Sequence, residues 1–279
     1  MDRRFISLFI IVFIDLIGFG IVIPVLMLHA EESFGASDLQ ATLLLSAYSI
    51  GMVFAGPVLG RLSDAFGRRP VLIISQIGTL AGFLILGFAN SLFLLYLGRM
   101  IDGVSGGNIS TAQAYINDIT TEKNRARGFG LVSAAFSAGF IVGPALGGLV
   151  VKVTSSIPAV ADYSQQAPFF VAALFSLFSI LGTSFVLKES LPPEERSPLG
   201  QKKTQTNPDG KPRASLLDVL RIPNVRFILL FTTTTFLAFS MLQSSFPIFV
   251  RRNIFTEYSL EDAQGGIGLM LTWLGTMGY

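Results

Sequence analysis

Three charged residues lie inside long apolar stretches, where a charge needs a chemical reason. Asp15 stands in the middle of the apolar run 5–28, and Arg99 and Asp102 are three residues apart in the run 92–115. A charged side chain in hydrocarbon is costly unless it is paired or faces water, and a carboxylate removed from water favours its neutral form unless a cation is close. Asp15 is therefore a candidate for binding and releasing a proton, and Arg99 and Asp102 are candidates for a functional site.

Each of these charges also has a structural explanation. Arg99 and Asp102 share one face of a helix and can form a salt bridge within it. Asp15 can be a buried, protonated residue that hydrogen-bonds to the next helix. The residues alone leave both explanations open.

A short basic connection separates two apolar runs. It reads Gly60-Arg61-Leu62-Ser63-Asp64-Ala65-Phe66-Gly67-Arg68-Arg69-Pro70. Gly67 can adopt a left-handed backbone conformation, Pro70 suits the first turn of a helix, and Asp64 can pair with Arg68. An ordinary basic turn is the alternative.

The run 128–151 carries glycines at helical spacing. Its pattern is Gly139, Gly143, Pro144, Gly147 and Gly148. Glycines four residues apart let a neighbouring helix approach closely, and a proline bends the helix that contains it. Simple helix packing explains the same pattern.

The elements that must position these residues are membrane-spanning helices. Hydrophobic residues make up 51% of the 279 residues and charged residues 14%, and the mean hydropathy is +0.62. This composition excludes a soluble globular enzyme and a disordered chain. Because the chain has no cysteine and a single histidine, we expect no metal site and no cofactor. Runs long enough to cross a bilayer are 5–28, 39–60, 70–90, 92–115, 128–151, 168–187 and 227–250, with an eighth from about 265.

Basic residues predict the orientation. Most of the 20 Lys and Arg fall in the segments that share a side with the N-terminus, so the positive-inside rule places the N-terminus in the cytoplasm. The same rule explains the basic pI of about 9.0 without nucleic acid. Residues 188–225, rich in Pro, Lys and Gln, read as a cytoplasmic linker.

A weak internal repeat suggests a second half. The matching positions are Phe13 and Pro24 with Phe236 and Pro247, and Asp38, Gln40 and Gly51 with Asp262, Gln264 and Gly275. We predict a six-helix half over 1–187, the linker over 188–225, and the start of a second half over 226–279. Since the sequence stops within its eighth apolar run, we expect further C-terminal helices in the full-length protein.

The 60–70 connection resembles that of the major facilitator superfamily, which carries G-x-L-x-D-x-x-G-R-R/K between helices two and three. The matching residues are Gly60, Leu62, Asp64, Gly67, Arg68 and Arg69. The resemblance implies an all-α integral membrane bundle. It also implies that this loop is a conformational latch, in which Asp64 and Arg68 hold the two halves together at the cytoplasmic side through charge contacts. Asp118, at the inner end of helix four, is a possible partner of the latch. Arg99 and Gly103 resemble the R-x-x-x-G pattern of helix four, which in that family is linked to proton coupling.

The glycine pattern resembles the antiporter signature G-x-x-x-G-P-x-x-G-G of the twelve-helix drug:proton antiporters. Asp15 and Pro24 are spaced as in exporters of the tetracycline-resistance type. Those exporters generally carry a further carboxylate in helix three, and 71–89 contains none, which makes tetracycline a doubtful substrate. Asn108, Gln113 and Gln243 are candidates to line a substrate cavity, with interhelical hydrogen bonding as the alternative. His29 is expected at the surface.

The resemblance implies a proton-coupled exporter of small amphipathic compounds that works by alternating access. Its expected partners are a small-molecule substrate, protons and the lipid bilayer, with no nucleic acid. An importer or uniporter of the same fold is one alternative. A truncated product without transport activity is another.

Overall fold

The computed structural model describes residues 3–197, 222–257 and 260–277, and all regular structure there is helical. Its long helices are α1 (Arg3–Phe34), α2 (Asp38–Phe66), α3 (Arg68–Gly87), α4 (Leu92–Gly106), α5 (Ile109–Ile119), α6 (Arg125–Ser155), α7 (Ala167–Phe185), α9 (Pro223–Asn253) and α10 (Leu260–Met277). Two short 3-10 helices are η1 (Ala161–Tyr163) and η2 (Pro193–Glu195). Helices cover every apolar run predicted from the sequence.

Five of the described helices are long and apolar enough to cross a membrane: α1, α2, α3, α6 and α7. In hydrocarbon a helix satisfies its own backbone hydrogen bonds, which is why long apolar runs fold this way. The predicted single helix over 92–115 is wrong in detail, because a turn at Gly107 and Asn108 divides it into α4 and α5. At Gly107 a side chain would lie 2.8 Å from the Gly56 nitrogen. A close crossing of α2 therefore coincides with the turn.

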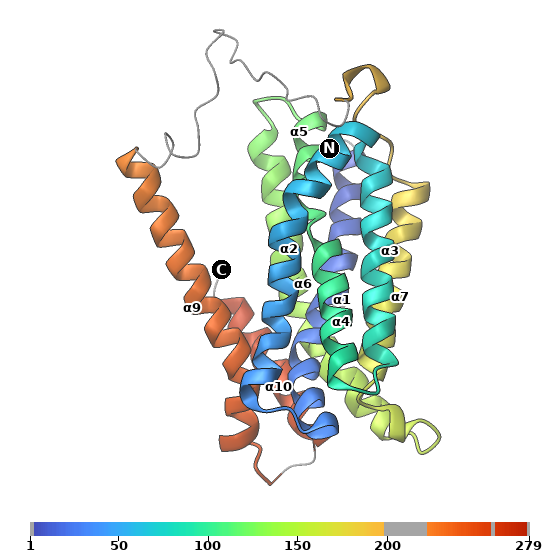
Figure 1. Ribbon diagram of the computed structural model, residues 1–279, viewed down its shortest axis with the longest axis vertical. Helices are drawn as coiled ribbons and strands as arrows, with labels where there is room; N and C mark the ends of the chain where they lie inside the picture. The colour runs from blue at the N-terminus through green and yellow to red at the C-terminus, as the bar shows by residue number, and fades with distance from the viewer. Residues whose placement is uncertain (1–2, 198–221, 258–259, 278–279) are drawn as a thin grey trace.

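The helices α1 to α7 form one bundle. α1 packs along α6 and α7, α2 packs along α4, and α3 packs between α4 and α7. The N-terminus and the α2–α3 connection lie at the same end of this bundle, at the top of Figure 1. We call this the latch end, and the end that holds the α1–α2 connection the opposite end.

The helices α9 and α10 join this bundle mainly through α6. α10 packs along α6, whereas α9 diverges from the bundle toward the latch end (Figure 1). Large apolar side chains are exposed near the start of α9, among them Phe227 and Phe231. Near its other end, α9 contributes Val250 to a small core with Leu28 of α1 and Ile267 of α10. The added helices thus contact the bundle most closely at the opposite end.

Candidate functional site

The α2–α3 connection is a single residue. α2 ends at Phe66 and α3 begins at Arg68, and Gly67 between them has φ +104, a backbone region that favours glycine. Pro70 falls in the first turn of α3, as the sequence predicted. This tight corner places Asp64, in the last turn of α2, beside Arg68.

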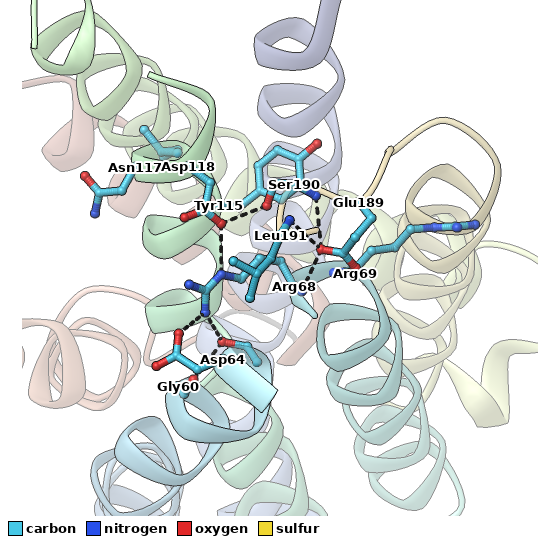
Figure 2. A network of polar contacts seen from close by, with 12 residues as sticks. Gly60, Asp64, Arg68, Arg69, Tyr115, Asn117, Asp118, Glu189, Ser190 and Leu191 are labelled. Atoms are coloured by element: carbon cyan, nitrogen blue, oxygen red, sulfur yellow. Dashed lines mark hydrogen bonds and ion pairs between the residues drawn. The ribbon is translucent and has the colours of Figure 1, made fainter. Parts of the chain in front are cut away.

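Arg68 is buried and holds two carboxylates. Its Nη1 lies 2.6 Å from Asp64 Oδ1, and its Nε lies 3.0 Å from Asp118 Oδ2 on α5. Nη1 also donates to Ser63 Oγ at 2.7 Å. Charge-assisted bonds of this kind are the strong ones in proteins. The guanidinium therefore ties α2 and α5 to the start of α3 (Figure 2).

The sequence analysis did not identify Glu189, a residue distant in the sequence that contacts the start of α3. Its carboxylate accepts hydrogen bonds from the backbone N–H groups of Arg68 and Arg69 at 2.9 and 3.2 Å, and also from those of Ser190 and Leu191 (Figure 2). Gly67 has no side chain to cap α3. Glu189 supplies that cap, and its negative charge suits a helix N-terminus.

Further contacts fix the segment that follows α7 to this corner. Tyr115 Oη donates to the Lys188 carbonyl at 2.7 Å, and Ser190 Oγ donates to Asp118 Oδ2 at 2.9 Å. The side chain of Arg69 donates to the carbonyls of Thr183 and Ser184 at the end of α7. The start of the predicted linker is therefore part of the polar network around Arg68. The only sequence signal was an acidic residue two positions after an apolar run.

The second group of charges lies in the middle of the bundle. Arg99 and Asp102 are both buried, with Arg99 Nη1 2.6 Å from Asp102 Oδ2. The guanidinium carbon lies 4.6 Å from the centre of the Tyr48 ring and 5.5 Å from that of Phe19. The intrahelical salt bridge considered from the sequence is thus present. It accounts for one nitrogen of Arg99, since Nε and Nη2 are buried without a hydrogen-bond partner.

Gly103 and Arg99, four residues apart on α4, both take part in the contact with α2. A side chain at Gly103 would lie 2.2 Å from the Tyr48 carbonyl oxygen. Only glycine allows α2 to come this close, and the close approach places the Tyr48 ring over the Arg99 guanidinium. The pattern therefore builds a cation–π contact between α2 and α4.

Asp15 lies on α1, and Asn108, in the turn before α5, is within hydrogen-bonding reach of it. Its Oδ1 is buried and has no partner. Among the ion pairs of the described residues, none joins Asp15 to Arg99. The three proton-coupling candidates therefore form two neighbouring groups rather than one.

The glycine pattern of α6 faces two helices. A side chain at Gly143 would lie 2.5 Å from Gly20 Cα on α1, and one at Gly148 would lie 2.8 Å from the Gln264 carbonyl on α10. Pro144 stands inside α6, and its carbonyl faces Gly268 of α10. We call this double contact the glycine seam.

The three residues predicted to line a substrate cavity have different positions. Asn108 lines a small cavity with Asp15, Gln113 is exposed on α5, and the side chain of Gln243 lies outside the described residues. The expectation for His29 is wrong. It is buried, its Nδ1 lies 3.0 Å from Ser33 Oγ, and its ring packs between Phe34 and Phe169.

Comparisons with known proteins agree on one family. The family model described as Major Facilitator Superfamily matches residues 8–278. Tetracycline resistance protein, class H, of Pasteurella multocida is 30% identical over 279 residues, which cover 99% of this chain and 64% of that protein. Multidrug resistance protein 2 of Bacillus subtilis is 34% identical over 204 residues, 73% of this chain and 48% of that protein. The chain thus spans about two thirds or less of these relatives.

Solved structures show the same fold. The human organic anion transporter MFSD10 (TETRAN) aligns with a TM-score of 0.65 and 25% identity, over 98% of this chain and 71% of that one. A bacterial homologue of the human lysosomal transporter Spinster aligns with a TM-score of 0.71 and 20% identity, over 99% of this chain and 60% of that one.

Proposed function

Because this chain belongs to the major facilitator superfamily, we propose that it acts in a secondary active transporter that exports small amphipathic compounds in exchange for protons. The observation that carries the proposal is Asp15. It is a carboxylate in the middle of an apolar helix, with one buried oxygen that no hydrogen bond satisfies. Such a group is suited to bind a proton and to release it when its surroundings change.

Residues 1–187 are the first half of this transporter, 188–225 the linker, and 226–279 the start of the second half. Alternating access requires that one half rocks against the other around a central site. The glycine seam supports this division, because its contact with α10 is where the bundle meets the added helices most closely. Small residues at such a contact allow sliding without large side chains in the way.

The latch end faces the cytoplasm in this proposal, which follows the distribution of basic residues. α9 stands apart from the bundle at that end and contacts it at the other (Figure 1). A substrate would therefore enter from the cytoplasmic side in this conformation. The ion-pair partners of Arg68 among the described residues, Asp64 and Asp118, both belong to the first half. We therefore assign the latch to keeping the helices of that half in register while the halves move, rather than to joining the two halves.

Proton coupling is assigned to Asp15 and to the Arg99–Asp102 pair. Substrate binding and proton binding favour states that open to opposite sides, so proton entry from outside drives export. The relatives named as tetracycline and multidrug resistance proteins support a drug-like substrate class. No carboxylate stands in α3 between Val71 and Gly87, so the substrate range is proposed to differ from that of tetracycline exporters.

The test uses the full-length protein in inside-out membrane vesicles. Wild-type protein should accumulate an amphipathic dye when a proton gradient is imposed, and dye addition should release protons from the vesicle lumen. Asp15→Asn should reduce gradient-driven accumulation by at least about a hundredfold. Asp162→Asn, which changes an exposed carboxylate in η1, is the matched control and should transport normally.

Three results would overturn the proposal. Uptake by intact cells rather than efflux would favour an importer or uniporter of the same fold. Export against a gradient by Asp15→Asn would remove Asp15 from the proton route. Absence of transport by the wild type would favour a product without activity.

A further inference from the structure

A small cavity lies directly beside Asp15. Its volume is about 40 Å³. The polar side chains that line it are Asp15, Gln76 and Asn108, and the other lining residues are apolar. It is set between α1, α3, α5 and α6, inside the first half of the protein rather than between the halves. A volume of this size holds about two water molecules and is too small for a drug.

Gln76 directs an unsatisfied oxygen at this cavity. The side chain is 2% exposed, and its Oε1 has no hydrogen-bond partner. Its Nε2 donates to Ser179 Oγ at 2.7 Å, and Ser179 Oγ donates to the Ile11 carbonyl at 3.3 Å. Since the Ser179 hydroxyl proton is used on Ile11, Ser179 must accept from Gln76. This requirement fixes which end of the amide faces Ser179 and leaves Oε1 as the free end.

The cavity therefore joins two hydrogen-bond acceptors. Asp15 Oδ1 and Gln76 Oε1 are both buried and both unsatisfied, while Asn108 is already within reach of Asp15. Two buried acceptors without a donor are costly, because each has lost its hydrogen bonds to water. Water supplies two donors per molecule, and a protonated Asp15 supplies one.

An apolar layer separates the cavity from the latch. Leu8, Leu72, Tyr115 and Ile116 belong to one buried cluster on the latch-end side of Asp15. Phe5, near the start of α1, lies beside Gly128 at the start of α6, which confirms that α1 runs from the latch end past this layer. This apolar cluster lies between the cavity and the Arg68 network.

We propose that this cavity binds ordered water, held between Asp15 Oδ1 and Gln76 Oε1, and that this water is the proton acceptor for Asp15. The inference rests on the proposed proton coupling. In the transfer, the Asp15 O–H bond breaks and a proton joins the oxygen of the first water. That water passes one of its own protons to the second water. When the apolar layer parts, the second water passes a proton to solvent water at the latch end. Asp15 is left as a carboxylate, and Gln76 acts as a positioning residue.

The other titratable groups that interact with Asp15 do not line this cavity. They are Asp102 on α4, paired with Arg99, and Tyr48 on α2. The cavity lining from α3, α5 and α6 contains no charged residue. The proposed water is therefore the proton acceptor of Asp15 on the latch-end side.

The first experiment detects the water without transport. The full-length protein is placed in lipid nanodiscs and exposed to a brief X-ray pulse, which converts bound water into hydroxyl radicals that oxidise adjacent side chains. Leu8 and Leu72 line the cavity, and Leu44 and Leu95 are buried leucines that do not line it. We expect the first pair to be oxidised at least about threefold faster than the second. Equal rates would overturn the proposal.

Two variants remove the site in different ways. Gln76→Leu removes the acceptor, and Ala112→Val fills the cavity from α5 and leaves Gln76 intact. Both should lower oxidation of Leu8 and Leu72 to the level of the control leucines. Both should also slow drug-driven proton release by at least about tenfold while dye binding is unchanged. Loss of dye binding and proton release together, with labelling unchanged, would contradict the role assigned to the water.

A sodium ion is the other ligand that two acceptors can hold. Labelling and transport are therefore compared in sodium chloride and choline chloride. Equal results support water, whereas a sodium-dependent loss of labelling together with sodium-dependent transport would replace water by a cation. The proposed function and this inference fail separately. Gradient-driven transport by Asp15→Asn would overturn the proposed function. Equal oxidation rates of the cavity and control leucines in the wild type would overturn the water site.

Discussion

The two ends of the helix bundle are held together by different chemistry. At the latch end, Arg68 is buried, and its partners Asp64 and Asp118 belong to the same bundle. At the opposite end, ion pairs cross from α9 to the first two helices. Arg252 Nη2 lies 2.5 Å from Asp38 Oδ1 at the start of α2, and Arg251 Nη2 lies 3.7 Å from Glu32 on α1. Lys152 of α6 and Asp262 of α10 make a third pair at 3.3 Å, which is exposed, as the Arg252–Asp38 pair is.

This difference indicates which ion pairs persist while the protein changes conformation and which of them break. A buried, doubly paired guanidinium is costly to break, because the partners left behind keep buried charge. Exposed pairs are weak and screened by salt, so they form and break easily. We infer that the latch preserves the shape of one half throughout the transport cycle, whereas the pairs at the opposite end open and close with it.

Removal of Arg68 should give the largest effect. Arg68→Ala leaves two carboxylates close together without their shared cation, and we expect a loss of about 3 kcal/mol in the free energy of unfolding. Thermal unfolding in detergent measures it. Arg61→Ala, an exposed arginine in the last turns of α2, should change stability little. Similar losses for both variants would mean that the latch is an ordinary surface contact.

The glycine seam should rank second. Gly143→Ala places a Cβ 2.5 Å from Gly20 Cα, and backbone must move to admit it, at about 1–3 kcal/mol. Gly130→Ala is the matched control in the same helix, because nothing lies within 4 Å of its added Cβ. We expect Gly130→Ala to raise the melting temperature and Gly143→Ala to lower it. A neutral Gly143→Ala would show that the two helices are not held at this spacing.

Glu189 extends the comparison to the segment after α7. Glu189→Ala removes the acceptor of the α3 N-terminus and should cost about 1–2 kcal/mol. Glu189→Gln keeps an acceptor oxygen and should recover part of that loss. Glu194→Ala, on the exposed η2, serves as the control. If Glu189→Ala matched the control in thermal unfolding, the segment after α7 would not belong to the latch.

Much of the bundle could be predicted from the sequence, because membrane helices need long apolar runs and those runs are visible. The Asp64–Arg68 pair could also be predicted, since it is local and one glycine separates the helices. Asp118 could be predicted from the expected topology, which places the end of helix four on the same side of the membrane as the loop between helices two and three.

The roles of Glu189 and Gln76 could not be predicted from the sequence. Glu189 meets Arg68 and Arg69 across more than a hundred residues of chain, and its role exists only because α7 ends beside α3. Gln76 shows no charge pattern, and its free oxygen follows from the hydroxyl that its amide nitrogen contacts. The buried position of His29 depends on Phe34 and Phe169 closing around the ring. The turn at Gly107 reflects the crossing of α2. These features depend on tertiary packing, which apolar periodicity does not encode.

The smallest effect on stability is expected at the opposite end, although it bears most directly on transport. Arg252→Ala removes the exposed pair with Asp38 and should leave the melting temperature unchanged. It should instead shift the population toward states in which the opposite end is open. Because the chain has no native cysteine, spin labels on Leu39→Cys and Thr256→Cys, both exposed, can report the distance between α2 and the α9–α10 connection. We expect a longer-distance population in Arg252→Ala, the same population in wild type at high salt, and no change in the control Arg226→Ala. A distance distribution that ignored both the mutation and salt would mean that the ion pairs do not hold this end closed. The two ends would then differ in chemistry but not in role.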